Sequence, residues 1–241
     1  MKKGKFKKVI ILTVLCTILC IVTSMLSACI DTGNKNPVVT MEMDPTGKSG
    51  ISGSFQIELY PDKAPNSVNY FIGLVLKGFY DDFYATKVMA GHLVEFGDPW
   101  YLKKNDRVIA GEFAENGYTG NDIKFERGTV GLCLYQDEKG IDNDSAMGDF
   151  FVILSDDAGN DFDGKYAAIG KIVSGLDILD RISNISTSSA ISYQPMYSAR
   201  TEKTTINLKG ETYPAAVTTR RKHYSGYVTD DFLNGNTEDE K

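Results

Sequence analysis

The chain of 241 residues can hold one large domain or two small ones, and its 42% hydrophobic and 11% aromatic content excludes a disordered protein. Its formal net charge of −6 argues against nucleic acid as a partner, because binding to phosphates needs a surplus of Lys and Arg.

The first residues have the pattern of a secretory signal. Met1–Lys8 holds five lysines and no acid, and the 17 residues Val9–Met25 carry no charge. The ending Leu26-Ser27-Ala28-Cys29 resembles the lipobox of bacterial lipoproteins. That resemblance implies cleavage before Cys29, a diacylglyceryl anchor on its sulfur, and a location on the extracytoplasmic face of the bacterial cell membrane. An uncleaved anchor helix is the alternative, although the run is short for a membrane span.

The signal also sets the expected domain division. We expect a signal peptide over residues 1–28, a tether over 29–36, a folded domain over 37–210, and a partly disordered C-terminal extension over 211–241. Removing residues 1–28 takes the net charge from −6 to −11, so attachment to an anionic membrane would depend on the lipid anchor. Cys133 would then have no cysteine partner in the folded domain, where it reads as a buried small hydrophobe.

The folded part begins with a predicted hairpin and a helix. Val38–Met43 and Ser54–Tyr60 alternate between apolar and polar residues, which is typical of half-buried strands. A helix is expected to open at Ala64 or Asn66 and to stop at Gly78. Its apolar stripe has helical spacing and consists of Val68, Phe71, Ile72 and Val75.

Short strand-like runs separated by turn residues follow. They are Phe83–Met89, His92–Phe96, Thr129–Tyr135, Asp149–Leu154, Tyr166–Val173 and Thr204–Leu208. A second helix is predicted over Gly175–Ile182, and the basic cluster Arg220-Arg221-Lys222 reads as a solvated turn. Many short strands with two helices indicate a mainly β sandwich or barrel.

The order of these elements and several local sequences resemble the cyclophilins. The motifs that carry the resemblance are Phe55–Phe71, Gly78-Phe79-Tyr80-Asp81, Gly97-Asp98-Pro99, Gly111-Glu112-Phe113, Arg127–Val130, Phe150–Ile153, Asp163–Tyr166 and Gly170–Val173. They are collinear over residues 36–183. The resemblance implies a closed eight-stranded antiparallel barrel capped by two α-helices, with a substrate groove on its outer surface.

The resemblance also implies an activity, peptidyl-prolyl cis-trans isomerisation. In this family an arginine donor stabilises the twisted amide, and alignment back from Gly97-Asp98-Pro99 puts Lys87 at its position. Tyr166 stands where the family has His or Tyr and could donate to the substrate carbonyl. We therefore predict Lys87 and Tyr166 as the catalytic residues. The reaction breaks no covalent bond, so no cofactor or metal is expected.

The remaining groove positions are carried over in the same way, and several depart from the family pattern. The predicted substrate-binding residues are His92, Leu93, Glu95, Cys133, Asp149, Phe151 and Phe162. Glu95 and Asp149 replace two glutamines, so acids stand in place of amide donors. The acidic run from Asp156 to Asp163 lacks the spacing of a calcium loop and reads as a solvated loop.

Three functional hypotheses stay open at this stage. The first is an isomerase that helps secreted, proline-containing polypeptides to fold at the membrane surface, as a monomer. The second is a related module that binds proline-containing or extended segments without isomerising them. The absence of the family's Arg and Gln residues favours this hypothesis. The third is an envelope scaffold in which the groove has no role.

Overall fold

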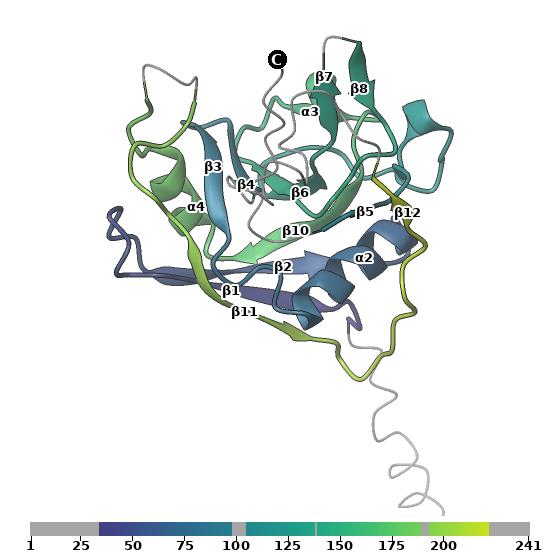
Figure 1. Ribbon diagram of the computed structural model, residues 1–241, viewed down its shortest axis with the longest axis horizontal. Coiled ribbons are helices and arrows are strands. Elements are labelled where there is room, and N and C mark those ends of the chain that lie inside the picture. Colours follow the sequence, from purple (N-terminus) through teal and green to yellow (C-terminus); the bar gives the residue numbers. More distant parts are fainter. Residues whose placement is uncertain (1–33, 98–104, 138, 189–192, 222–241) are drawn as a thin grey trace, which may run out of the picture. The chain divides into compact units, whose positions relative to one another are not determined.

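A computed structural model of the chain describes residues 34–97, 105–137, 139–188 and 193–221. The unit that begins at Asn36 is built on one curved antiparallel sheet of eight strands (Figure 1). In sheet order the strands are β11 (Thr201–Asn207), β1 (Val38–Met43), β2 (Gly53–Leu59), β10 (Ala168–Ser174), β6 (Thr129–Leu132), β9 (Phe150–Ile153), β4 (Leu93–Gly97) and β3 (Tyr84–Met89).

The predicted hairpin is confirmed as β1 and β2, and its register follows from the alternating sequence. Val39 lies opposite Ile57 and Met41 lies opposite Phe55. All four side chains are fully buried on the inner face of the sheet, while the residues between them are more exposed. A shift of one residue would turn this apolar set to the other face, so the hydrophobic pattern fixes the pairing.

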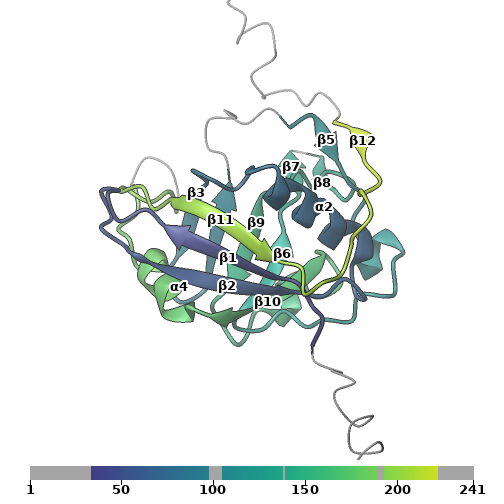
Figure 2. The same cartoon turned by 90° about the horizontal axis from the view of Figure 1, so that it is seen from below.

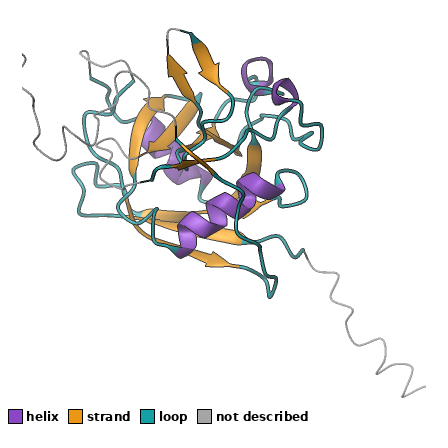
Figure 3. Ribbon diagram, turned by 45° about the vertical axis from the view of Figure 1, so that its right-hand side comes forward, coloured by secondary structure: helices purple, strands orange, loops and turns teal. Residues whose placement is uncertain are grey.

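Two helices close the inner face of the sheet. They are α2 (Pro65–Leu76) and α4 (Leu176–Ser183), close to the helices predicted from the sequence. The helices lie at opposite ends of the sheet, and their apolar stripes join the same core cluster as the strands (Figures 1 and 3). In α2 the buried residues include Val68, Phe71 and Ile72, and in α4 they include Leu179 and Ile182.

A buried carboxylate caps the start of α2. No side chain of the helix itself provides a cap, but Glu112 lies only 8% exposed against its first turn. Glu112 accepts hydrogen bonds from Asn66 N at 3.1 Å and from Ser67 N at 2.7 Å. These bonds satisfy two of the amides that a helix start leaves unpaired, and the negative charge favours the positive end of the helix dipole.

The expectation of a closed barrel is wrong, because the sheet is open between its edge strands β3 and β11. Tyr84 and Arg200 form an isolated bridge there, and Ala85 N donates to Ala199 O at 2.8 Å. No ladder continues from this point, because the residues just before Thr201 bend instead of extending alongside β3. The short apolar runs predicted strands, but they carried no information on this bend.

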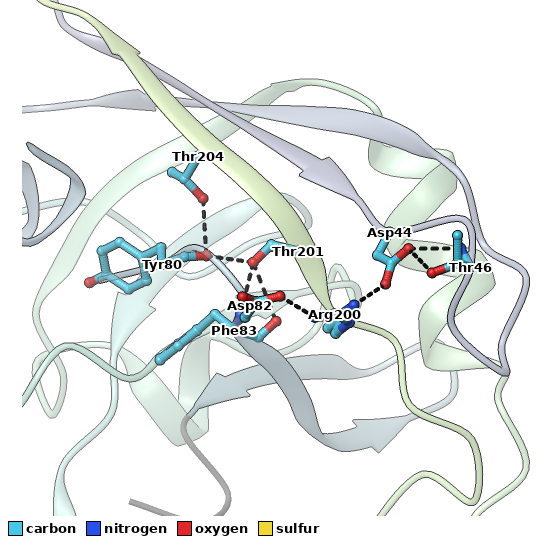
Figure 4. A network of polar contacts seen from close by, with 8 residues as sticks. All are labelled: Asp44, Thr46, Tyr80, Asp82, Phe83, Arg200, Thr201 and Thr204. Carbon is cyan, nitrogen blue, oxygen red and sulfur yellow. Dashed lines mark hydrogen bonds and ion pairs between the residues drawn. The ribbon is translucent and has the colours of Figure 1, made fainter. Parts of the chain in front are cut away.

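A network of side chains spans the opening (Figure 4). The Arg200 guanidinium lies 2.5 Å from the carboxylate of Asp44, which follows β1, and it also pairs with Asp82, which precedes β3. Asp44 is buried, and two hydrogen bonds from Thr46 together with Arg200 lower the pKa of its carboxyl. On the other side of the bridge, Thr201 Oγ1 donates to the carbonyl of Tyr80. Side-chain contacts thus join the two edges where the ladder stops.

The chain beyond β11 runs past α2 and ends in a short strand (Figure 2). This strand, β12 (Thr219–Arg220), pairs with β5 (Arg107–Val108), and the Asn66 side chain makes two hydrogen bonds to the backbone of Val217. The predicted turn is therefore wrong for Arg220, which lies in β12, whereas the predicted solvent exposure of its side chain is confirmed. Residues 222–241, the rest of the C-terminal extension that was predicted to be partly disordered, lie outside the described residues.

The smaller elements lie in the connections before β6, between β6 and β9, and between β9 and β10. They are the hairpin of β7 (Tyr135–Asp137) and β8 (Gly140–Asp142), the 3-10 turn Ala114–Asn116, and the short helix α3 (Gly159–Phe162). Among the described residues, no helix combines the length and the apolar character that crossing a membrane requires.

Candidate functional site

A second apolar cluster lies on the outer face of the sheet, separate from the core between the sheet and the helices. It arises because β4 and β9 are buried on both faces. Phe96 and Phe150 point inward, whereas Leu93 and Phe151 point outward. The outer cluster consists of Leu93, Phe125, Phe151, Ile153, Ala158 and Ala168, with the partly buried Met89, Ile123, Cys133, Phe162 and Tyr166 against them.

Phe151 is the centre of this cluster. Its ring centroid lies 5.1 Å from that of Phe162, 5.4 Å from that of Tyr166 and 5.6 Å from that of Phe125. These separations are in the range favoured by aromatic pairs. Phe162 and Tyr166 remain partly exposed, so the rings present an open apolar surface.

The rings lie directly against the sheet because β6 has a glycine beneath them. A Cβ built on Gly131 would lie 2.5 Å from the Phe151 ring and 2.8 Å from the Phe125 ring. Any other residue at this position would push both rings outward. A glycine inside a strand is unfavourable in itself and often marks such a close approach.

One carboxylate connects the loops that carry two of the rings. Asp163, which follows α3, accepts a hydrogen bond from Phe125 N at 2.7 Å and pairs with Lys124 at 3.0 Å. The α3 turn places Phe162 beside this contact. Asp163 is therefore a residue that positions the cluster, and not a member of the solvated acidic loop predicted from the sequence.

A charged rim adjoins the rings. Lys87 of β3 lies opposite Glu95 of β4, and Glu95 in turn lies opposite Phe151. Asp149 precedes β9, and its carbonyl accepts a hydrogen bond from Cys133 N at 2.9 Å. Burial raises the pKa of the Glu95 carboxyl, and the charge on Lys87 offsets part of that rise. Although Lys87 and Glu95 lie opposite each other in the ladder, these two described residues form no ion pair.

Two further groups at the rim are held in their neutral forms. Burial raises the pKa of the Cys133 thiol well above its ordinary value, and the charges on Glu95 and Asp149 raise it further. Burial also raises the pKa of Tyr166, with smaller contributions from Cys133 and Glu95. The phenol of Tyr166 therefore keeps its proton at neutral pH and can donate a hydrogen bond.

The structure brings together the groove residues predicted from the sequence. Leu93, Cys133, Phe151, Phe162 and Tyr166 form or line the outer cluster. Lys87, Glu95 and Asp149 each lie close enough to Cys133 for their charges to shift the pKa of its thiol. His92 stands at the margin, with its ring centroid 6.3 Å from that of Phe162. Cys29, the predicted lipidation site, lies outside the described residues.

Two residues of this region were not predicted. Phe125 is 2% exposed and stacks on Phe151, yet no motif marked it. Its signal was weak, namely that Ile123 and Phe125 alternate with charged residues just before the Arg127 motif. Tyr193 lies beside Lys87, and no sequence pattern connects two residues that are so far apart along the chain. Among the described residues, no three His, Cys, Asp or Glu side chains gather into a metal site.

Known proteins resemble this chain in sequence over most of its length. The sequence profile of the family described as cyclophilin type peptidyl-prolyl cis-trans isomerase/CLD matches residues 39–224. The chain is 30% identical over 149 residues to peptidyl-prolyl cis-trans isomerase A of Dickeya dadantii, an overlap of 59% of this chain and 73% of that protein. It is 27% identical over 156 residues to peptidyl-prolyl cis-trans isomerase 10 of Caenorhabditis elegans, covering 65% of this chain and 91% of the relative.

A solved structure gives the same result for the fold. A cyclophilin type peptidyl-prolyl cis-trans isomerase of Cryptosporidium parvum superposes with a TM-score of 0.56 at 19% identity, over 71% of this chain and 98% of that chain. At this identity the similarity supports the fold alone.

Proposed function

Since this chain belongs to the cyclophilin-type peptidyl-prolyl cis-trans isomerase family, we propose that its outer aromatic cluster binds the proline ring of a polypeptide. Residues at the rim of this cluster would catalyse cis-trans isomerisation of the peptide bond before that proline. The observation that carries the proposal is the position of the cluster, which lies outside the core with partly exposed rings beside a cation and a neutral phenol. A cluster that served packing alone would need neither the exposure nor the polar rim.

The reaction requires hydrogen-bond donors at a defined place. The barrier to amide rotation is about 18–20 kcal/mol, and uncatalysed X–Pro exchange takes tens to hundreds of seconds. In the twisted transition state the amide loses resonance, and the proline nitrogen becomes pyramidal with a lone pair. A donor directed at this nitrogen, or at the adjacent carbonyl, binds the transition state more tightly than either ground state.

Lys87 and Tyr166 are the donors that the rim offers. Lys87 would direct its ammonium at the amide, while the Tyr166 hydroxyl would donate to a substrate carbonyl. Leu93, Phe151 and Phe162 would hold the proline ring. A lysine lacks the flat fork of the family's arginine, and loss of one oriented donor costs about 10²–10³ in rate. We therefore expect an isomerase that is slower than relatives with arginine.

The second candidate function is a module that binds proline-containing or extended segments without turnover. The identity of the rim acids favours it. An ionised carboxylate at Glu95 or Asp149 can only accept hydrogen bonds, whereas an amide at the same place could also donate to the substrate backbone. This module would keep the apolar pocket and lose most of the catalysis.

The proposed setting is the membrane surface. A diacylglyceryl group on Cys29 would tether the domain there, where secreted polypeptides emerge and begin to fold. The support is the sequence of residues 1–29, with its basic start, apolar run and Leu-Ser-Ala-Cys ending. Mass spectrometry of the membrane fraction would detect the diacyl group and the new terminus at Cys29. An intact Met1 would contradict the lipoprotein assignment.

The activity is tested by exchange NMR on a short X–Pro peptide, with the native protein beside Lys87→Arg. We expect catalysed exchange with the native protein and an increase of about tenfold or more in the variant, because arginine restores an oriented donor. Exchange in the variant alone would favour the binding module. Absence of exchange in both, with a folded protein, would contradict the proposed function.

A further inference from the structure

Lys87 faces an aromatic ring from a distant part of the chain. Its Nζ lies 6.0 Å from the centroid of the Tyr193 ring, which is about the distance at which a ring face attracts a cation. The main chain also joins the two segments, because Val88 N donates to Tyr193 O at 2.8 Å. The ring therefore adjoins β3 at the edge of the groove.

The segment that carries Tyr193 is held in place without the help of Lys87. Ser188 N donates to Gln194 O at 2.8 Å, and Thr187 forms a bridge with Pro195. These contacts and the bond to β3 fix the backbone at Tyr193, which keeps the residue beside Lys87.

The backbone of Tyr193 adopts an unfavourable conformation. Its φ is +63°, in the left-handed region that residues with a Cβ rarely occupy. The side chain is 45% exposed, so burial offsets little of that cost. A strained residue with little packing points to a contact that the side chain makes, and the contact seen here is with Lys87.

Lys87 needs such a support more than an arginine would. Its ammonium sits at the end of a flexible four-carbon stem, whereas a guanidinium presents a rigid fork. Glu95 lies opposite it in the ladder, but the two form no ion pair. The charge on Lys87 still acts on the Glu95 carboxyl, while the ammonium itself lies over the face of the Tyr193 ring.

We propose that Tyr193 is a positioning residue for Lys87, whose ring face holds the ammonium at the rim of the groove where the twisted amide forms. The inference builds on the proposed isomerase function. In this protein a ring supplied by a separate segment takes over part of the orientation that the arginine fork gives to other family members.

The test compares three variants of the full-length protein in detergent micelles. Tyr193→Phe keeps the ring, whereas Tyr193→Leu and Tyr193→Gly remove it, and glycine also relieves the left-handed backbone. We expect kcat to fall about two- to fivefold in the Leu and Gly variants, with KM unchanged and the Phe variant near native. Tyr197→Leu, at another half-exposed tyrosine of the same region, should leave both constants unchanged.

A second readout does not depend on activity. Reductive ¹³C-methylation keeps lysine charged, and the Lys87 signal can be assigned by its loss in Lys87→Arg. We expect a ring-current shift of this signal in the native and Phe proteins that disappears in the Leu and Gly variants. Its absence in the native protein, or loss of kcat in the Phe variant as well, would overturn the inference. A shift present in a protein without isomerase activity would contradict the proposed function and leave the contact established.

Discussion

The two faces of strands β4 and β9 show what distinguishes the core from the candidate site. On the inner face, Phe96 and Phe150 stack with their centroids 5.0 Å apart, fully buried, within a cluster closed by two helices. On the outer face, Phe151 packs at similar distances against rings that remain partly exposed. The same strands thus supply stability on one side and an open apolar surface on the other.

The largest expected effect comes from opening the inner face. Phe150→Ala removes a fully buried ring and leaves a cavity, so we expect the free energy of unfolding to fall by about 3–5 kcal/mol. A urea denaturation curve recorded by far-UV circular dichroism measures this free energy. A loss below about 1 kcal/mol would mean that the inner cluster does not carry the stability of the fold.

An intermediate effect is expected where the outer rings contact the sheet. In Gly131→Ala the new methyl group would collide with the rings of Phe151 and Phe125. Overpacking of this kind costs about 1–3 kcal/mol, and the displaced rings should also weaken binding of X–Pro peptides. Thermal unfolding and peptide titration give the two values. Unchanged affinity in a destabilised variant would separate the outer cluster from ligand binding.

The smallest effect concerns the rim and depends on pH. Burial raises the pKa of Glu95, so the folded state binds its proton more tightly than the unfolded state does. The unfolding free energy therefore decreases as pH rises from the ordinary glutamate pKa to the raised one. We expect Glu95→Gln to be more stable than the native protein at pH 7 and equal to it below pH 4. A constant difference across this range would exclude burial of the charge as the cause.

The sequence predicted those elements whose pattern is local. The hairpin of β1 and β2 followed from alternation, and α2 followed from the stripe of Val68, Phe71 and Val75 with Gly78 at its end. The collinear family motifs added the groove positions, which the structure places together around Phe151.

The features that the sequence did not predict depend on contacts between distant segments. Strand β12 has two residues and exists through its pairing with β5, so no periodicity marks it. The opening beside β3 depends on a bend before Thr201, and Arg200 connects the edges only once the fold has formed. Tyr193 reaches Lys87 across more than a hundred residues of sequence for the same reason.

The central claim is that the outer ring cluster binds proline, and NMR titration tests it most directly. Aromatic ¹³C labelling would follow all the rings while an Ala-Pro peptide is added, with an Ala-Ala peptide as control. We expect shifts in Phe125, Phe151, Phe162 and Tyr166 with the proline peptide alone, and none in the inner rings Phe96 and Phe150. Equal shifts with both peptides, or no shift in the outer rings, would contradict the account.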